Sequence, residues 1–287
     1  MSRNLSLELQ DDDFLSLRDV IAQEAGIRLT DFKRVFLQSR LTPRLRELGI
    51  NNFKDYIHLL KPPAAQKEEI GLLINQITTN ETRFFRENHH FEYLKETYLP
   101  PRLPETGGAP SFRFWSAGCA TGEEAYSLAM TLSEIQSHTP GMAWHILATD
   151  IDSQALNKAQ AGLFPEKCAS HIPPIFLKKF FLKGVDERSG WIKVRSSIRE
   201  RITFEYFNLH KPKDLPWGPF DGIFCRNVLI YFLPQSLERI LAFFHRHLKP
   251  GGVLFLGHSE ILFGQEDFFK GLGRTIYVKS DQKVNGE

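Results

Sequence analysis

The sequence predicts an α/β fold in which a mostly parallel β-sheet is covered by helices on both faces and preceded by an all-helical domain. Two observations support this prediction. Up to about residue 99, the hydrophobic residues recur at helical spacing. After residue 111, the strand-like runs FRFWSA, HILATD, TFEYF, FDGIFC, VLFLG and TIYVK are interrupted by helical patterns around 122–135, 153–161 and 235–248. Such alternation is typical of parallel sheets with helical crossovers.

The helical domain is expected to span residues 1–99. Its first helix, DDDFLSLRDVIAQEAG, has hydrophobic residues on one face and ends in Gly26, a residue suited to the left-handed position after a helix. A second helix is expected to begin with Thr42 as N-cap and Pro43 in its first turn, and to end at Gly49. The runs FKDYIHLL and KEEIGLLINQI continue the helical pattern.

A linker and an insertion organise the rest of the chain. Residues 100–111, PPRLPETGGAPS, are rich in proline and glycine and are expected to link the helical domain to a second domain at 112–287. Within that domain, residues 164–202 break the alternation of strands and helices. They offer a helix and then WIKVRSSI, an alternating strand pattern after a DERSG turn. We interpret this segment as a small inserted β subdomain.

The composition excludes several classes of protein. The formal net charge of +2 over 287 residues indicates no polyanionic partner by itself. We expect no signal peptide and no membrane span, because no apolar run is long enough. The three cysteines lack CxxC spacing, which argues against a disulfide framework and against a metal site. Reduced thiols in a cytoplasmic protein are the simplest interpretation.

The turn after the first strand of the second domain suggests the kind of ligand. Its spacing, Gly118-x-x-x-Gly122, misses the GxGxxG dinucleotide fingerprint, and no P-loop lysine follows. Thr121 and Glu124 fit a capping box, which would give Glu124 a structural role. Glu123 is then the carboxylate next to the turn. It would repel a phosphate but suits an ammonium or sulfonium group.

A second carboxylate follows the next strand. Asp150 ends the hydrophobic strand HILATD, where a carboxylate can accept hydrogen bonds from both hydroxyls of a ribose. The alternative is that Asp150 caps the following helix, although Asp152 is better placed for that task. A cationic ligand with a ribose and without phosphate points to S-adenosylmethionine.

Five stretches together resemble one family. TTNETRFFRE (78–87), FWSAGCATGEEAYSLAM, ATDID (148–152), FDGIFCRNVLIYF (220–232) and GGVLFLGHSE (251–260) are similar to motifs of the chemotaxis receptor glutamate methyltransferases, the CheR family. The resemblance extends from about residue 12 to residue 279. It includes the helical N-terminal domain, the order and spacing of the motifs, and the inserted subdomain.

The resemblance implies a class I S-adenosylmethionine-dependent methyltransferase domain with a Rossmann-like fold. It also implies transfer of methyl to glutamate side chains on cytoplasmic chemoreceptor helices, giving γ-methyl esters and S-adenosylhomocysteine in sensory adaptation. By motif match, the cofactor contacts of the family fall on Asn80, Thr82, Arg86, Glu123, Asp150, Asn208, Leu209, Arg226 and Asn227. The tyrosine of the NVxIYF motif is Tyr231.

Arg86 and Tyr231 are the candidate catalytic residues. If residues 80–87 are helical, Asn80, Thr82 and Arg86 fall within two turns. The guanidinium of Arg86 can bind a carboxylate in bidentate fashion, either that of the cofactor or that of the substrate. The alternatives are an Arg86 exposed to solvent on an amphipathic segment and a Tyr231 that only fills the core. With the resemblance, a hydroxyl near the transferred methyl group is favoured.

A basic cluster in the helical domain is the candidate receptor-docking surface. It consists of Lys33, Arg34, Arg40, Arg44 and Arg46. Such a cluster would attract the glutamate-rich helices of a chemoreceptor, although an ordinary solvated face is the alternative. Nucleic acid is not expected as a partner, because aromatic and basic residues are not interleaved as in a stacking platform. We expect a monomer that does not insert into the membrane.

Two other functions share parts of the pattern. Another class I methyltransferase would share Glu123 and Asp150 but would not need TTNETRFFR or the basic helical domain. A module that binds S-adenosylmethionine without turnover would not need Arg86, Asn227 and Tyr231. The sequence leaves open which receptor, glutamates and signalling pathway are involved. It also leaves open whether a receptor C-terminal peptide binds the subdomain, because its turn, GVDERSG, is more charged than the glycine-rich loop of family members that bind one.

Overall fold

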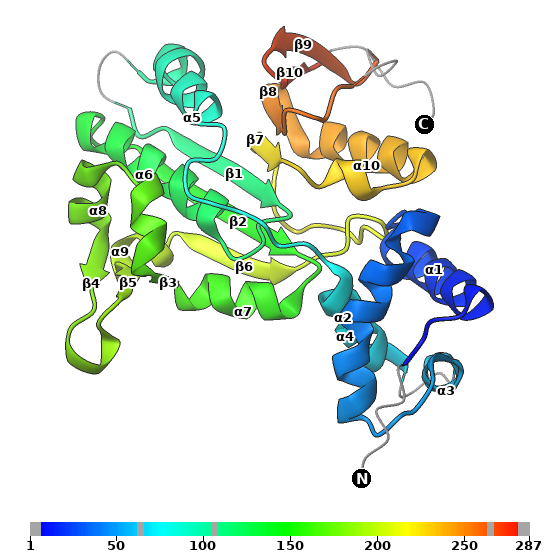
Figure 1. Cartoon of the computed structure of the whole chain (residues 1–287). Helices are drawn as coiled ribbons and strands as arrows, with labels where there is room; N and C mark the ends of the chain where they lie inside the picture. The colour runs from blue at the N-terminus through cyan, green and yellow to red at the C-terminus, as the bar shows by residue number, and fades with distance from the viewer. Residues whose placement is uncertain (1–6, 62–65, 105–107, 263–266, 281–287) are drawn as a thin grey trace.

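The chain forms an N-terminal helical domain that faces the carboxyl ends of strands in a seven-stranded sheet (Figure 1). The computed structural model describes residues 7–61, 66–104, 108–262 and 267–280. Within these residues the N-terminal domain has four α-helices: α1 (Asp11–Ala25), α2 (Arg34–Glu47), α3 (Phe53–Leu59) and α4 (Gln66–Ile77). Their apolar faces enclose a core that includes Leu17, Leu41 and Leu73. The predicted end of the first helix is confirmed, because Gly26 adopts a φ of 69° directly after α1.

The second helix begins earlier than predicted. The expectation of an N-cap at Thr42 is wrong, because α2 runs from Arg34 through Pro43 to Glu47. The buried face of α2, Leu37, Leu41 and Leu45, continues across the proline and holds both parts of the helix on the core. The Thr42 hydroxyl donates to the Gln38 carbonyl at 2.7 Å, as side chains inside a helix do. Gly49, at a φ of 68°, follows the end of the helix as predicted.

The segment that follows α4 packs with the sheet. Helix α5 (His89–Tyr93) and the π-helical turn η2 (Leu94–Tyr98) bring Phe91, Leu94 and Leu99 into the hydrophobic core on one face of the sheet. The core of the N-terminal domain, by contrast, ends at Ile77. By core packing we therefore place the domain boundary near residue 78 instead of at residue 99.

The main sheet is mostly parallel, as predicted. Its strand order is β6 (Ile202–Tyr206), β2 (Ala143–Asp150), β1 (Ser111–Ala117), β7 (Phe220–Cys225), β8 (Leu248–Leu256), β10 (Ile276–Lys279) and β9 (Phe269–Gly273). The first five are parallel, and β10 pairs antiparallel with both of its neighbours, β8 and β9. The order reverses between β1 and β7, so a crevice is expected at their carboxyl ends. The arrowheads of β1, β2 and β6 point toward the N-terminal domain (Figure 1).

Helices cover both faces of this sheet. On one face, α6 (Glu123–His138) and α7 (Ser153–Ala161) pack in the same core as α5. On the other face, α10 (Pro234–His247) buries Ile240, Leu241 and Phe244. Between the two layers, all six residues of β7 are buried, and so are the carboxyl-terminal parts of β1, β2 and β8. That burial explains why these strands appear in the sequence as nearly continuous hydrophobic runs.

The predicted insertion is a separate small subdomain. Its three antiparallel strands lie in the order β3 (Leu163–Pro165), β5 (Trp191–Val194) and β4 (Phe181–Lys183), with the helices α8 (Pro174–Phe180) and α9 (Ser196–Arg199). The run WIKVRSSI is only half a strand, because α9 begins at Ser196. The subdomain thus lies between α7 and β6 in the chain, as predicted.

Candidate active site

A cleft lies at the carboxyl ends of the parallel strands. The N-terminal domain contributes Ala25, Ile27 and the segment that leaves α4, so the cleft lies between the two domains. Apolar side chains such as Phe207 and Phe232 form part of its wall, and Asp150, Glu124 and Arg86 supply charge. Of the cofactor residues predicted from the sequence, the cleft brings together Asn80, Thr82, Arg86, Asp150, Asn208, Leu209, Arg226 and Asn227, but not Glu123.

The glycine turn after β1 forms the floor of the cleft. Gly118 and Gly122 adopt φ angles of 88° and 96°, which side chains with a Cβ rarely tolerate. A Cβ on Gly118 would lie 2.5 Å from the Val228 side chain, so the turn needs glycine there for space as well. The amides of Gly118 and Cys119 donate to the Thr149 carbonyl at 2.8 and 2.9 Å, which fixes the turn to the end of β2.

Asp150 is the carboxylate that ties this turn to β2. One of its oxygens accepts the Ala120 amide at 2.8 Å and the other accepts the Asp152 amide at 2.9 Å. Burial raises the pKa of Asp150 to about 6, and these amide donors oppose the rise. Asp152, not Asp150, caps α7, because its side chain accepts the amides of Gln154 and Ala155. The helix-capping alternative for Asp150 is therefore wrong, and its carboxylate faces the cleft.

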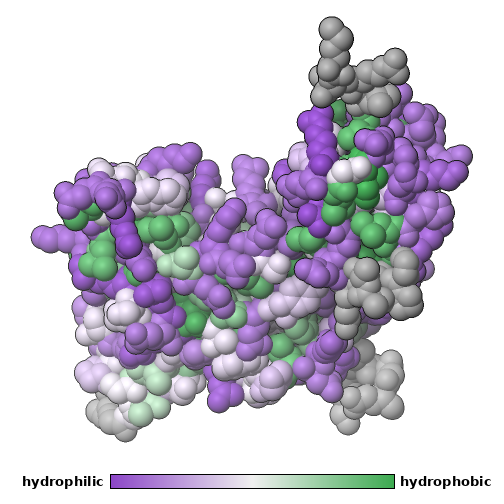
Figure 2. All heavy atoms as spheres, turned by 90° about the horizontal axis from the view of Figure 1, so that it is seen from below, coloured by the Kyte–Doolittle hydropathy of each residue, from purple (hydrophilic) through white to green (hydrophobic). Residues whose placement is uncertain are grey.

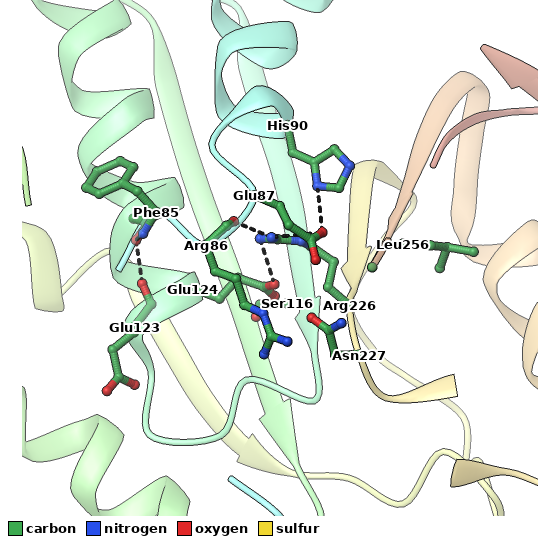
Figure 3. Close-up of polar contacts among 12 residues, drawn as sticks. Phe85, Arg86, Glu87, His90, Ser116, Glu123, Glu124, Arg226, Asn227 and Leu256 are labelled. Carbon is green, nitrogen blue, oxygen red and sulfur yellow. Dashed lines mark hydrogen bonds and ion pairs between the residues drawn. The ribbon is translucent and has the colours of Figure 1, made fainter. Parts of the chain in front are cut away.

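The two glutamates at the start of α6 differ from their predicted roles. The capping box is wrong, because Gly122 is the N-cap and the Thr121 hydroxyl donates to Glu123 at 2.6 Å. Glu124, which we expected to cap, accepts the Ser116 hydroxyl at 2.7 Å and lines the cleft. The Glu123 carboxylate points away from Arg86 and Arg226 (Figure 3).

Glu123 instead lies in a separate hollow beside the main cleft. This hollow is formed by the 82–84 segment and by the inserted subdomain, which contributes Lys167, Cys168 and His171. Thr82 and Arg83 line both the hollow and the cleft, so the two are adjacent. Burial raises the pKa of Glu123 above its ordinary value.

The segment between the domains carries Arg86. The helical conformation that we considered for residues 80–87 does not form: residues 79–83 have no regular structure, and Phe85 and Glu87 adopt positive φ angles of 51° and 54°. The Asn80 amide donates to the Asp152 carboxylate at 2.6 Å and thereby fixes the start of the segment. Arg86 donates to the Glu81 carbonyl at 3.0 Å and lines the cleft.

A buried ionic cluster holds the end of this segment. The guanidinium of Arg226 lies 3.2 Å from Glu87 and 3.4 Å from Glu124, and it also donates to the Arg86 carbonyl. The side chain of Arg226 is only 2% exposed, so these contacts compensate a charge that has left water. Figure 3 shows Arg226 between Glu87, Glu124 and the backbone of Arg86. Sequence reasoning missed Glu87, although it directly follows Arg86 in the TRFFRE motif.

Two strand ends supply the remaining walls. Asn208, after β6, donates its amide to the Glu24 carbonyl at 2.8 Å and accepts the His210 amide, and Leu209 beside it is buried. After β7, Asn227 adopts a φ of 60°, and Tyr231 is 37% exposed at the cleft. The side chain of Asn208 thus joins the sheet to α1, a contact that the sequence did not suggest.

The donor set of the cleft suits an adenosine-containing cation. The Asp150 carboxylate is available to hydroxyl groups, the apolar walls can contact an aromatic ring, and Glu124 supplies negative charge near the turn. Among the described residues no group of three or more His, Cys, Asp and Glu side chains could hold a metal ion. No helix within the described ranges is both long and apolar enough to cross a membrane.

Comparison with known proteins agrees with a domain boundary near residue 78. Residues 12–78 match the family model described as CheR methyltransferase, all-alpha domain, and residues 80–278 match CheR methyltransferase, SAM binding domain. The chemotaxis protein methyltransferase of Escherichia coli (strain K12) is 39% identical over 96% of this chain and 93% of its own length. The one from Salmonella typhimurium is 40% identical over 97% of this chain and 93% of its own. The cofactor is therefore S-adenosylmethionine, as predicted.

Proposed function

The chain belongs to the CheR methyltransferase family, and on that premise we propose that it methylates glutamate side chains of methyl-accepting chemotaxis receptors. The products would be glutamate γ-methyl esters and S-adenosylhomocysteine. The observation that carries the proposal is the position of Arg86, a cation that lines the same cleft as the Asp150 carboxylate and the Tyr231 hydroxyl. The cleft thus offers partners for a cationic nucleoside and also for an incoming carboxylate. Such a reaction would take place in the cytoplasm.

The proposed chemistry requires little of the protein besides alignment. When bound, S-adenosylmethionine supplies a methyl group on an already activated sulfonium. A glutamate with an ordinary pKa near 4.3 is ionised at neutral pH, so no general base is needed. A carboxylate oxygen forms a bond to the methyl carbon while the carbon–sulfur bond breaks, and the electron pair remains on sulfur. Alignment of three atoms can supply on the order of 7–11 kcal/mol.

Each residue then has a stated role in the proposal. Asp150 accepts the ribose hydroxyls, and Glu124, which lines the cleft, favours the cationic end of the cofactor. Glu123 would act on the cofactor only from the adjacent hollow. Arg86 and Tyr231 orient the attacking carboxylate. Since Arg226 is enclosed by Glu87 and Glu124, we propose that its main task is to hold Arg86 in place. Asn80, Thr82, Asn208, Leu209 and Asn227 remain proposed cofactor contacts, and they line the cleft.

The test is methyl transfer to a purified receptor fragment. We expect label from methyl-tritiated S-adenosylmethionine to enter the fragment and to be released by mild base, as an ester is. A fragment whose helix glutamates are replaced by glutamine is the control and should stay unlabelled. Base-stable label would indicate a different substrate. Binding of S-adenosylhomocysteine without any transfer would indicate a binding module instead of an enzyme.

The structure divides the predicted docking residues into two groups. Arg34 pairs with Asp11. Arg44 contacts Glu69 with two nitrogens, at 2.7 and 3.1 Å, and this hydrogen-bonded partner raises the pKa of Arg44. Arg44 is therefore a structural residue that joins α2 to α4. We propose that docking depends on the other three, Lys33, Arg40 and Arg46.

Exposed apolar residues accompany these cations. Phe32 is 97% exposed and Val35 is 75% exposed, while Lys33 and Arg40 lie 5.1 and 5.2 Å from the Phe36 ring. Figure 2 shows hydrophobic atoms among hydrophilic ones on the N-terminal domain, at the right of the view. A surface of this mixed kind fits an amphipathic helix rich in glutamate better than it fits a purely polar polyanion.

Reversal of two of these charges is expected to weaken receptor methylation. In Lys33→Glu/Arg40→Glu, kcat/KM for the receptor fragment should fall about tenfold at low salt, because like charges then face the glutamate-rich helices. The affinity for S-adenosylhomocysteine, measured by calorimetric titration, should not change.

Arg44→Glu is the contrasting variant for this surface. It leaves Glu69 facing a second carboxylate and should lower the melting temperature, which the double reversal should not do. Unchanged receptor kinetics in Lys33→Glu/Arg40→Glu would remove this surface from docking. The effect of the reversal should also shrink as salt is added.

A further inference from the structure

A buried glutamate outside the cleft organises the loop after β7. Glu260 lies four residues beyond the end of β8 and is 5% exposed. Its Oε2 accepts the amides of Asn227 and Gly257 at 2.7 and 2.6 Å. Its Oε1 accepts the amides of Val228, Leu229 and Ile230 at 2.8, 2.7 and 3.3 Å. One carboxylate therefore satisfies four consecutive amides of one loop and a fifth amide from another.

These hydrogen bonds help to fix the backbone conformation of residues 227–230. Asn227 is at a φ of 60°, and the 3-10 turn η6 (Leu229–Tyr231) follows it. The amides at the start of a helical turn have no partner within the turn, so an outside acceptor must supply one. Gly257 allows the close approach, because a Cβ there would lie 2.5 Å from the Asn227 side chain.

The far end of the same loop is held by the N-terminal domain. The Arg28 amide donates to the Tyr231 carbonyl at 2.7 Å, and Ile27 forms a β-bridge with Phe232. Tyr231 is thus placed between two anchors, one at Glu260 and one at residues 27–28. Glu260 itself is not among the residues that line the cleft.

We propose that Glu260 is a positioning residue for methyl transfer: its carboxylate sets the backbone of residues 227–230 and thereby directs Asn227 and Tyr231 into the cleft. The roles of Asn227 and Tyr231 rest on the proposed function. Glu260 does not contact the reacting groups and acts only through this loop. The GHSE motif thus contributes its glutamate to the site, whereas His258 is exposed and lies outside the cleft.

The test compares Glu260→Gln with a matched control. The amide nitrogen of glutamine would face at least two backbone N–H groups that now have an acceptor, so the loop should shift. We expect kcat for receptor methylation to fall about 10- to 100-fold, since a displacement near 1 Å can have that effect. The affinity for S-adenosylhomocysteine should fall several-fold. The control is Asp221→Asn, at the opposite end of β7, where Asp221 is also buried and accepts the Arg113 amide at 2.7 Å.

A merely structural role for Glu260 predicts a different pattern. In that case both variants would have a lower melting temperature, while kcat and cofactor affinity would stay within about twofold of wild type. This result would overturn the proposal.

A double-mutant cycle tests whether Glu260 acts through Tyr231. If Glu260 acts through Tyr231, the substitution Tyr231→Phe should lower kcat less in the Glu260→Gln background than in wild type. Additive effects would contradict the proposal.

A more conservative variant and a hydrogen-exchange measurement complete the test. If Glu260→Gln does not fold, Glu260→Asp retains the charge, shortens the side chain by one methylene and should show the same pattern more weakly. Hydrogen exchange of the amides of residues 228–230 should accelerate in both variants and not in Asp221→Asn. The cofactor titration needs no receptor, so it tests Glu260 even if the receptor proves not to be the substrate.

Discussion

Arg86→Ala is expected to lower kcat for receptor methylation by about 10²- to 10³-fold, the usual loss when a charge-stabilising donor is removed from a reaction site. The guanidinium lies in the cleft with its nearest described contact at the Glu81 carbonyl, 3.0 Å away. It has no carboxylate partner among the residues described, unlike Arg226, so it can receive an incoming carboxylate. Receptor methylation and cofactor titration on the same preparation measure the effect.

The split between kcat and cofactor affinity identifies which carboxylate Arg86 binds. If it orients the substrate, the affinity for S-adenosylhomocysteine should change only slightly. If it binds the carboxylate of the cofactor, that affinity should fall in parallel with turnover. Arg86→Lys keeps the positive charge but lacks the planar guanidinium group, which can donate two hydrogen bonds to one carboxylate. It should therefore recover only part of the rate. Arg113→Ala, at the amino end of β1, is the control. Near-wild-type methylation by Arg86→Ala would remove the residue from the mechanism.

The order of the elements could be predicted from the sequence because it depends on local hydrophobic patterns. The strands of the parallel sheet are buried on both faces and therefore appear as apolar runs, with Arg226 and Asn227 directly after one of them. Pro43 misled the prediction for the opposite reason. Local rules place proline in the first turn of a helix, yet tertiary burial of Leu37, Leu41 and Leu45 continues α2 through it.

The roles of charged residues were harder to predict because their partners are distant in the chain. Glu69 lies 25 residues from Arg44, and its contact converts a docking candidate into a structural residue. Glu124 lies 102 residues from Arg226, so a local capping box was the only partner that the sequence suggested for it. Glu260, 31 to 33 residues from the amides of Asn227, Val228 and Leu229, gave no local signal except its place after a strand.

Asp150→Asn is expected to weaken binding of S-adenosylhomocysteine about 10- to 100-fold at pH 7.5, because hydrogen bonds to a charged group are worth roughly 1.5–3 kcal/mol. The product is the better probe, since it lacks the sulfonium charge and isolates the contribution of the hydroxyl groups. The wild type should also lose affinity as the pH falls. The pKa of Asp150 in the cofactor-free protein is raised to about 6, so the ionised acceptor disappears below that pH.

The pH profile separates Asp150 from the other acidic groups of the site. Wild-type affinity should be constant above pH 7 and should decrease by up to about tenfold per unit below pH 6, whereas Asp150→Asn should lack this decrease. An identical slope in both proteins would assign the effect to Glu123 or Glu124, whose pKa values burial also raises.

We expect Asp150→Asn to remain folded at pH 7.5, so unfolding would not account for its weak binding. Since the pKa of Asp150 in the folded protein exceeds its ordinary value, its contribution to stability is present at low pH and is lost as the pH rises through about 6. At pH 7.5 the ionised carboxylate therefore destabilises the cofactor-free protein. The neutral asparagine removes that cost, although it leaves either the Ala120 or the Asp152 amide with a poorer partner. A melting temperature close to that of the wild type, together with weak binding, would show that the buried charge of Asp150 strengthens cofactor binding and destabilises the cofactor-free protein.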